Sequence, residues 1–600
     1  MNPSRSFNSI VPRTRAWMNF LSWSIVNSIG MHADFTRACG WPSSGLQGTG
    51  WRSWRPSVRL FPNSRENTGG RKRMIKGATG AVLALAMGLC AFATPASAQT
   101  FVNIRTQDAP KYDPHSNTSS GMGHPMFMMG DTLVALDWDL KTVHPLLAKS
   151  WTISDDRLTY TFNLRDDVTF CSGKKFTADD VIYSFTRLAD PSARWPFYWR
   201  LGEIASLTAS DPHTLVYKLK RPHSELLVDL ANFAATIINK ENVETLGVDF
   251  GVKGFDGTGP LCWEKWEPRK ELVLKRHDAY KWGPTGVYAN KGPVKYERMI
   301  WRIVPEETTR IAAMMSGQAD FCHWNPLQAI ETFKKAPNLA VYEPTADFAM
   351  FYWGIKSTRE FVSDKRVRQA LSHLVDREEI NKAIFFGQAE TARSLVHPKS
   401  LDFESATLDV MTKRDLDKSR RLLDEAGWKM GSDNFRYKDG KKLELLMYSY
   451  TVGQNPKLSE IMQAAARTVG IDIKIQMWDP TVFFQKIAQQ DYDIWTLSVP
   501  YTSAGDQMYL YYHSKNRPVP NRMMWNDPET DRILEAGRSA TTDAEREKNF
   551  KLVQRMMHDE ALMIPAAHSR LFLVAKKSIK NVRAHGIYSA ALYKGLDVAP

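Results

Sequence analysis

The chain has 600 residues, of which 43% are hydrophobic and 24% charged, and its formal net charge at pH 7 is +14. Residues 1–98 hold 12 Lys and Arg against 2 Asp and Glu, so residues 99–600 carry a net charge of only +4. The excess charge belongs to one terminal segment and gives no support for nucleic-acid binding. The remaining 502 residues are more than a single hydrophobic core accommodates, so we expect at least two domains.

The N-terminal segment has two parts of different composition. Residues 1–73 scatter tryptophans among Arg, Ser, Pro and Gly without a sustained period. Residues 74–98 have a basic start, an apolar stretch from Ala78 to Ala93 and a small-residue ending, the pattern of a cleaved secretory signal peptide. We therefore expect translation to start at Met74 and the mature protein to begin near Gln99. Residues 1–73 are then untranslated sequence, and the alternative is a genuine long leader without structure.

Strands and helices alternate along the first half of the mature chain. Residues 101–107 predict a strand, and a polar loop containing His115 and Asn117 follows it. Apolar residues alternate over 158–164, which predicts another strand. Thr177 is the expected N-cap of a helix over 178–189. Further strands are expected at 215–219, 271–276 and 294–304, and further helices at 226–233 and 306–315.

The second half continues with the same mixture of elements. A strand at 443–448, a helix at 456–469 and a strand at 471–475 form a β-α-β unit, which implies a parallel pair of strands. Strands are also expected at 348–355, 494–499 and 564–574, and helices at 415–428 and 544–559.

Four segments match sequence motifs of one protein family. They are PLLAKSWTISDDRLTYTFNLRDDVTFCSGKKFTADDV at 145–181, GTGP at 257–260, RIVPEETTRIAAMMSGQADF at 302–321 and DKRVRQALSHLVDR at 364–377. In order and over almost the whole mature chain, the sequence resembles the peptide/nickel class, family 5, of extracytoplasmic solute-binding proteins of ABC importers. The resemblance implies an α/β, two-lobe periplasmic-binding-protein fold (type II, cluster C-like). Lobe one would comprise 101–345 and 566–600 with a subdomain inserted at about 145–255, and lobe two 346–565.

The resemblance also implies a function. The chain would be the periplasmic substrate-binding component of an ABC importer, a monomer that captures a short peptide or a peptide-like solute between hinged lobes and delivers it to a membrane permease. The alternatives are a non-peptide solute (an opine, a sugar conjugate, a nickel or haem chelate), a sensor or chaperone that binds peptides without transport, and a periplasmic hydrolase. No G-x-S-x-G, H-E-x-x-H or phosphate-binding glycine motif is present, so we expect no enzyme.

The most informative candidate site follows the strand at 494–499. Tyr501, Thr502, Ser503 and Asp506 lie in the loop at its carboxyl end, where open α/β sheets bind ligands. In peptide-binding relatives an aspartate of this loop pairs with the α-ammonium of the peptide, and our alignment places Ser503 at that position. Either Asp506 takes over this role, or the ligand has no free amine there. An ordinary helix N-cap at Asp506, before residues 508–512, is equally consistent with the sequence.

Other candidate ligand contacts are aromatic or polar residues near predicted strand ends: Trp324, Asn325, Tyr352, Trp353, His115 and Asn117. Any single aromatic of this set is more often a core residue. His115, His124, His323 and His373 also lie near predicted cleft loops, and relatives that bind nickel or haem suggest a metal interpretation. We expect these histidines to be capping or surface residues, and predict neither a metal nor a cofactor.

Three cysteines follow the signal peptide, namely Cys171, Cys262 and Cys322. In an oxidising compartment two of them can pair, and we predict the Cys262–Cys322 disulfide. The alternative is three free, buried thiols. The odd count and the absence of a C-x-x-C spacing argue against a zinc site.

Overall fold

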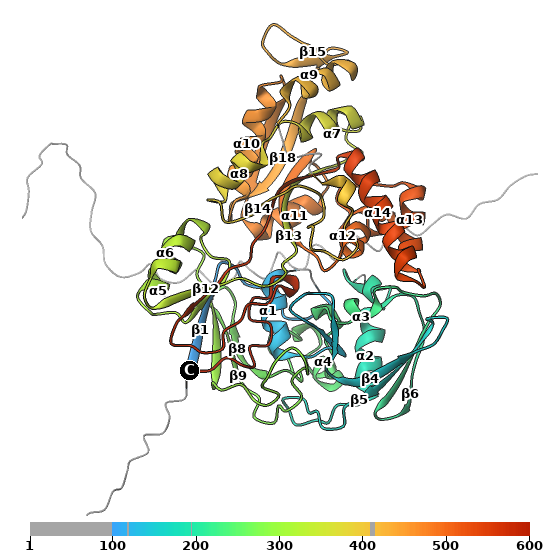
Figure 1. The fold of residues 1–600 in the computed structure, drawn as a ribbon, viewed down its shortest axis with the longest axis vertical. Coiled ribbons are helices and arrows are strands. Elements are labelled where there is room, and N and C mark those ends of the chain that lie inside the picture. Colours follow the sequence, from blue (N-terminus) through green and yellow to red (C-terminus); the bar gives the residue numbers. More distant parts are fainter. Residues whose placement is uncertain (1–98, 117–118, 194, 409–413) are drawn as a thin grey trace, which may run out of the picture. The chain divides into compact units, whose positions relative to one another are not determined.

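The computed structural model describes residues 99–600 except 117–118, 194 and 409–413 (Figure 1). The predicted leader, the signal peptide and the candidate Asn117 therefore lie outside the described residues. The described residues belong to one compact unit, Ala91–Pro600. Among them, no helix has both the length and the apolar character needed to cross a membrane.

Seven strands form the first sheet, in the order β12-β22-β11-β1-β10-β9-β8. β1 pairs in parallel with both β10 and β11, and the other pairs are antiparallel. The strands are β1 (Thr100–Arg105), β8 (Leu261–Glu267), β9 (Glu271–Arg276), β10 (Arg298–Ile303), β11 (Phe321–Cys322), β12 (Leu339–Tyr342) and β22 (Leu573–Lys576). β22, the last of these strands in the sequence, thus lies between β11 and β12, which come much earlier in the sequence.

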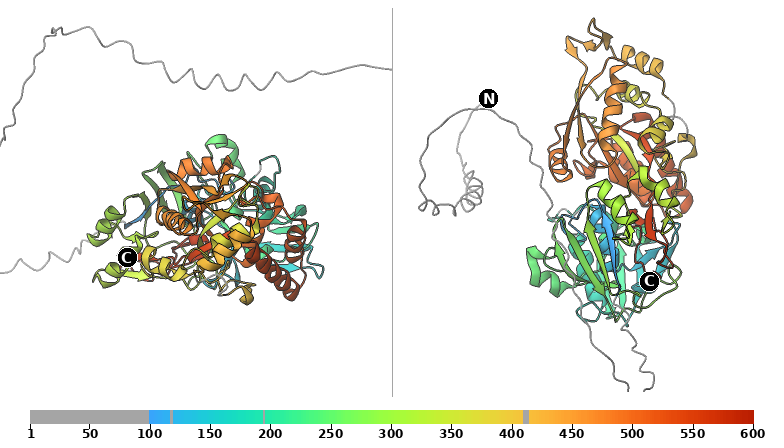
Figure 2. Two further views of the ribbon diagram at one scale, coloured as in Figure 1. Left: turned by 90° about the horizontal axis from the view of Figure 1, so that it is seen from above. Right: turned by 90° about the vertical axis from the view of Figure 1, so that its left-hand side faces the viewer.

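Six strands form the second sheet, in the order β14-β21-β13-β20-β18-β19. β18 pairs in parallel with β19 and β20, so the β-α-β unit expected from the sequence is confirmed. The strands are β13 (Ala349–Ile355), β14 (Glu390–Thr391), β18 (Glu444–Tyr450), β19 (Asp472–Trp478), β20 (Ile494–Pro500) and β21 (Met563–His568). The two larger sheets occupy separate parts of the described chain (Figures 1 and 2).

A smaller antiparallel sheet of four strands, in the order β4-β5-β7-β6, uses residues that fall within the predicted subdomain. These strands are β4 (Ala148–Ile153), β5 (Thr159–Leu164), β6 (Ile204–Asp211) and β7 (Thr214–Leu219). Short strands make the remaining sheets, β2 (Val134–Leu136) with β3 (Val143–Pro145), and β15 (Lys429–Met430), β16 (Arg436–Lys438) and β17 (Lys441–Lys442). The division into lobes at the predicted boundaries stays a prediction.

Several helices begin at residues whose side chains cap them. Thr177 caps α2 with a capping box to Asp180, and Asp364 and Asp376 accept hydrogen bonds from the first backbone amides of α7 and α8. The helices are α1 (Ser120–Met129), α2 (Ala178–Leu188), α3 (Leu226–Asp229), α4 (Lys240–Leu246), α5 (Glu307–Met315), α6 (Ile330–Lys335), α7 (Lys365–Ser372), α8 (Arg377–Ile384), α9 (Leu416–Glu425), α10 (Asn455–Arg467), α11 (Pro480–Ala488), α12 (Ala504–Tyr512), α13 (Pro528–Arg538) and α14 (Asp543–Glu560).

Two expectations about elements are wrong. Residues 564–574 are not one strand, because β21 belongs to the second sheet and β22 to the first, and the chain crosses between the sheets at 569–572. The helix expected at 226–233 ends at Asp229, and a separate 3-10 turn over Phe233–Ala235 follows, capped by the side chain of Asn232. In both cases tertiary contacts decide where a locally plausible element stops.

Candidate ligand site

Each of the two larger sheets contains parallel strands. The carboxyl ends of such strands form the edge at which open α/β sheets bind ligands. In the first sheet, β1, β10 and β11 end together, and Cys322 leads directly into His323 and Trp324. In the second sheet, β18 and β20 run in parallel, and Pro500 at the end of β20 leads into the loop before α12. The predicted position of that loop, at the end of a strand and before a helix, is confirmed.

A chain of hydrogen bonds joins three buried polar side chains below the first edge. His124 from α1 donates from Nδ1 to Nε2 of His323 over 2.8 Å, and His323 donates from Nδ1 to the Oδ1 of Asn103 over 3.0 Å. Burial lowers the pKa of both imidazoles well below its ordinary value, so both are neutral. The rings of Trp301 and Trp324 pack against this pair. The structure thus brings His124 and His323 together, whereas His373 lies near Asp415 and Lys418 at the end of α7.

His115, predicted as a ligand contact, is fully buried in the loop after β1. Arg187 donates to its Nδ1 over 2.6 Å and is itself paired with Asp113 over 2.7 Å. Burial, followed by the nearby guanidinium of Arg187, lowers the pKa of His115 to about 3. Because a neutral imidazole that accepts at Nδ1 carries its proton on Nε2, His115 offers a donor there. Among the described residues this Nε2 has no hydrogen-bond partner.

The loop before α12 is organised by its own side chains. Ser503 is the N-cap, because its Oγ accepts from the amide of Asp506 over 2.9 Å and its backbone is extended. Asp506 accepts at Oδ2 from the amide and the hydroxyl of Thr502 over 2.8 and 3.0 Å. The expectation that Asp506 is the N-cap, before a helix starting near 508, is therefore corrected: the helix starts at Ala504.

The carboxylate of Asp506 also forms a buried ion pair with a distant segment. Arg200 donates from Nη2 to the Oδ1 of Asp506 over 2.7 Å and from Nη1 to Asp229 over 2.5 Å, and all three side chains are at most 4% exposed. Arg538 lies over the rings of Trp199 and Tyr509 and 3.9 Å from Asp229. Two guanidinium groups thus face two carboxylates, and no charge of this cluster is left without an opposite charge.

Glu225 lies at the edge of this cluster and is neutral at pH 7. Burial and then the charge of Asp229 raise the pKa of Glu225 to about 8. His223 donates from Nε2 to Asp229 over 2.8 Å, while burial and then Arg538 lower its pKa to about 4. Neither group therefore disturbs the charge balance near neutral pH.

Of three more predicted contacts, Tyr501 and Asn325 are buried and already hydrogen-bonded within the protein, whereas Trp324 is not. Tyr501 accepts at its hydroxyl from the amide of His397 over 2.7 Å and stacks on Phe348. Asn325 donates to the carbonyl oxygens of Cys322 and Phe572 over 3.1 and 2.7 Å, which ties β11 to the crossing segment before β22. Trp324 is only partly buried and has a left-handed backbone with φ of 53°. Of these three, Trp324 keeps the most accessible surface.

Tyr352 and Trp353 on β13 are core residues in this structure. Trp353 is completely buried in the core of the second sheet and donates to the carbonyl of Leu458 over 3.2 Å. Tyr352 is 1% exposed, and its ring meets that of Trp495 edge-on. Adjacent residues of a strand point to opposite faces, so both faces of β13 are covered at this place.

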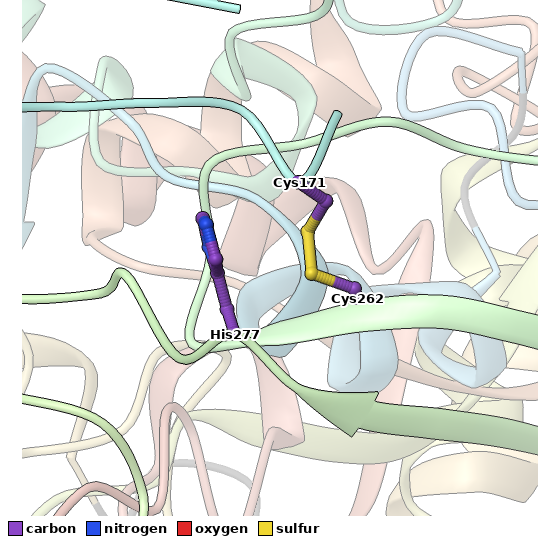
Figure 3. Close-up of side chains that lie close together, drawn as sticks. All are labelled: Cys171, Cys262 and His277. Atoms are coloured by element: carbon purple, nitrogen blue, oxygen red, sulfur yellow. A yellow bond between two sulfur atoms is a disulfide. The ribbon is translucent and has the colours of Figure 1, made fainter. Parts of the chain in front are cut away.

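The predicted Cys262–Cys322 disulfide is wrong. The structure has a disulfide between Cys171 and Cys262, with Cα atoms 5.8 Å apart (Figure 3). Cys322 is a buried free thiol. Cys262 lies on β8 and Cys322 on β11, and β9, β10 and β1 lie between them. Four strand spacings of about 4.8 Å separate the two residues, far beyond the Cα distance a disulfide spans.

Sequence analysis missed Arg200, Asp229, Glu225 and Arg538, the residues that surround Asp506. Arg200 and Asp506 are 306 residues apart in the sequence. Arg200 belongs to a short 3-10 turn, Tyr198–Leu201, which no periodic pattern of apolar residues predicts. The only local signal is composition. Arg200 follows Phe197 and Trp199 closely, and aromatic neighbours of this kind are unusual for an exposed arginine.

Comparison with known proteins identifies the family. The family model of bacterial extracellular solute-binding proteins, family 5, matches residues 142–520. The chain belongs to this family. The glutathione-binding protein GsiB of Salmonella typhi is 27% identical over 518 residues, which cover 83% of this chain and 94% of that protein. Heme-binding protein A of Haemophilus influenzae is 24% identical over 465 residues, covering 73% and 81%.

Solved structures confirm the fold of this family 5 protein. The periplasmic binding protein DppA of Helicobacter pylori, in complex with the peptide STSA, superposes with a TM-score of 0.74 at 21% identity and covers 84% of this chain and 98% of that chain. The predicted α/β fold of periplasmic binding proteins and the predicted family are thus confirmed. The chain is an extracellular solute-binding protein by family, and the resemblance seen in its sequence motifs was correct.

Proposed function

We propose that this family 5 protein is the periplasmic substrate-binding component of an ABC importer and captures a short peptide or a peptide-like solute. The ligand lies between a lobe built on the first sheet (101–345 with 566–600) and a lobe built on the second (346–565). A hinge closes the lobes, and the closed monomer delivers the ligand to a membrane permease. The chain binds and releases its ligand without chemical change.

The observation that carries this proposal is the buried Nε2 donor of His115, in the loop after β1, which has no hydrogen-bond partner among the described residues. A buried N–H group without a partner costs stability, on the order of 1–3 kcal/mol, unless something accepts from it. Its partner Arg187 leaves the donor on Nε2, and an acceptor group of a ligand would satisfy this donor. Peptide carbonyl groups and carboxylates are such acceptors, which favours peptide-like ligands over purely apolar ones.

The paired state of Asp506 supports a narrower proposal about the amino end of the ligand. An α-ammonium needs a carboxylate with spare negative charge, yet Arg200 already neutralises Asp506 within hydrogen-bonding distance. We therefore place Asp506 in the protein's own framework. The ligand either has a blocked amine or holds its amine at another place.

Calorimetry and thermal unfolding of the purified protein test these points. The panel contains di- and tripeptides with free and N-acetylated amino ends, glutathione, opines, a nickel–histidine complex and haem. A ligand at 100 times its Kd stabilises by about 2.7 kcal/mol, which raises the melting temperature measurably. We expect at least one peptide to bind and its N-acetylated form to bind within about threefold, since less than 1 kcal/mol then depends on the amine.

Two outcomes contradict the proposal at different levels. Binding of opines or chelates alone, with no peptide active, removes the peptide class but keeps solute binding. Loss of a peptide's affinity on N-acetylation, reproduced by Asp506→Asn with the free peptide, restores Asp506 as the amine anchor. Asp527→Asn, a change at the cap of α13, is the matched control for an aspartate at a helix start.

A further inference from the structure

Three potential metal ligands meet in the part of the chain built on the first sheet. Cys171 follows the small-sheet strand β5, Cys262 lies on β8, and His277 follows directly after β9. One ligand atom from each lies within 4.8 Å of the others. Figure 3 shows the imidazole of His277 beside the disulfide that joins the two cysteines.

The backbone holds these residues together without help from the disulfide. Cys171 donates its amide to the carbonyl of Gly257 over 2.9 Å, and His277 donates its amide to Pro260 over 3.0 Å. Cys262 pairs with Lys275 across the β8–β9 ladder, two residues before His277. Loop 257–260, which precedes β8, is fixed in turn because the amide of Gly259 donates to Met129 over 2.9 Å. The three side chains therefore stay neighbours when the sulfur–sulfur bond is broken.

The hydrogen bond of His277 selects the tautomer that a metal requires. Its Nδ1 lies 3.0 Å from the carbonyl oxygen of Gly259. A carbonyl only accepts, so Nδ1 carries the proton and the lone pair is on Nε2. Metal-binding histidines use the same arrangement, in which one ring nitrogen donates to a carbonyl or a carboxylate and the other binds the metal.

We propose that reduction of the Cys171–Cys262 disulfide creates a binding site for a thiophilic cation, Zn²⁺ or Cu⁺, with two thiolates and Nε2 of His277 as ligands. The reductant is a dithiol, which gives up two electrons and two protons to the disulfide and leaves as its own cyclic disulfide. Each cysteine is then a thiol, and the bound cation displaces one proton from each. Cys171 is partly exposed, which gives the dithiol access to one sulfur.

The ligand set fits such a cation. Two thiolates and one imidazole are a known set for zinc sites that leave a fourth position open, here for water. Zn–S bonds of about 2.3 Å in a tetrahedral arrangement place the sulfurs about 3.8 Å apart, and rotation of the cysteine side chains supplies that separation. Spacing along the chain hides this site, because its residues come from three segments. The prediction that the chain has no zinc site rested on that spacing.

Cobalt binding under anaerobic conditions tests the proposal. The full chain carries Cys39→Ser and Cys90→Ser, is reduced with dithiothreitol, freed of reductant and titrated with Co²⁺. We expect one equivalent to bind with a thiolate-to-cobalt charge-transfer band, and one equivalent of Zn²⁺ to abolish that band. The oxidised protein shows no band. Cys171→Ser or Cys262→Ser removes the band, and His277→Ala weakens cobalt binding at least tenfold.

The third cysteine provides the matched control. Cys322→Ser leaves the band and the stoichiometry unchanged, because Cys322 lies on β11 on the far side of β1 from β8. Absence of the band in a reduced protein that keeps its circular dichroism overturns the proposal. Unfolding on reduction also overturns the proposal, since the arrangement of Cys171, Cys262 and His277 then depends on the disulfide. So does a band that survives in the Cys171→Ser/Cys262→Ser double variant.

Discussion

Two buried polar regions of this protein use their side chains in opposite ways. Around Asp506, two guanidinium groups and two carboxylates from distant segments match each other charge for charge. Around His115, burial keeps the imidazole neutral, and its Nε2 donor has no partner among the described residues. The charges of the first region are satisfied within the protein, whereas the second leaves a buried donor that we propose meets an acceptor of the ligand. A carboxylate in the expected loop is therefore weaker evidence for ligand binding than an unpaired donor.

Removal of Arg200 gives the largest effect that this comparison predicts. Arg200→Met leaves Asp506 buried without a positive partner and Asp229 with only Arg538, 3.9 Å away, and we expect a loss of about 3–5 kcal/mol in the free energy of unfolding, measured in urea. Arg532→Met is the control, because Arg532 pairs with Glu529 while 65% exposed, and such pairs contribute at most about 1 kcal/mol. Adding Asp229→Asn and Asp506→Asn to Arg200→Met restores part of the loss. A cost below 1 kcal/mol for Arg200→Met contradicts the framework role of this cluster.

The same cluster gives a pH dependence through Glu225. Its pKa is raised from 4.5 to about 8, so the folded state binds a proton that the unfolded state has released. The contribution of Glu225 to stability is complete below pH 4.5, declines between pH 4.5 and about 8, and is lost above that range. Urea midpoints of the wild type and of Glu225→Gln, compared from pH 5 to 8.5, are expected to converge at acid pH and diverge at alkaline pH. The exposed Glu244→Gln serves as control and is expected to follow the wild type.

Replacement of His115 addresses the other region. His115→Phe keeps a ring in the buried position but removes the Nε2 donor, and we expect the affinity for the bound solute to fall about tenfold, the value of one hydrogen bond. Calorimetry measures the affinity, and thermal unfolding without ligand reports any general damage. His373→Phe, at the end of α7, leaves the affinity unchanged. Equal affinity in His115→Phe and the wild type excludes this donor from ligand recognition.

The smallest effect is expected at Ser503. Ser503→Ala removes the cap of α12, which costs about 1 kcal/mol of stability. It leaves the affinities for free and N-acetylated peptides unchanged, because the hydroxyl is used within the protein. Ser503→Thr keeps the capping oxygen and is expected to keep the stability. A selective loss of affinity for the free amine in Ser503→Ala contradicts the assignment of this loop to the framework.

The fold was largely predictable because its signals are local. The capping box of Thr177, the alternation over 158–164 and the β-α-β unit each follow from neighbouring residues, and the structure confirms them. Helix α1 was not predicted, because Gly121, Gly123 and Pro125 are poor helix formers and tertiary packing outweighs their propensity. The crossing from β21 to β22 was also not predicted, since no local pattern shows which sheet a strand joins.

The candidate site was predictable only in outline. Sequence analysis placed Asp506 shortly after a strand, as the structure has it, and chose His115, which lies buried in the loop after β1. It did not find Arg200, and therefore did not know that the charge of Asp506 is neutralised. The disulfide was wrong for the same reason. Which cysteine faces Cys262 depends on the order of strands in the first sheet, and that order is a long-range property.

The place of β22 between β11 and β12 has a consequence for biosynthesis. Cys322 is added to the growing chain about 250 residues before Leu573, the first residue of the strand that pairs with it. At roughly 5–20 residues per second, this edge of the first sheet waits roughly 10–50 s for its neighbour. During that interval the edge of the first sheet lacks one of its strands, whatever the stability of the finished protein.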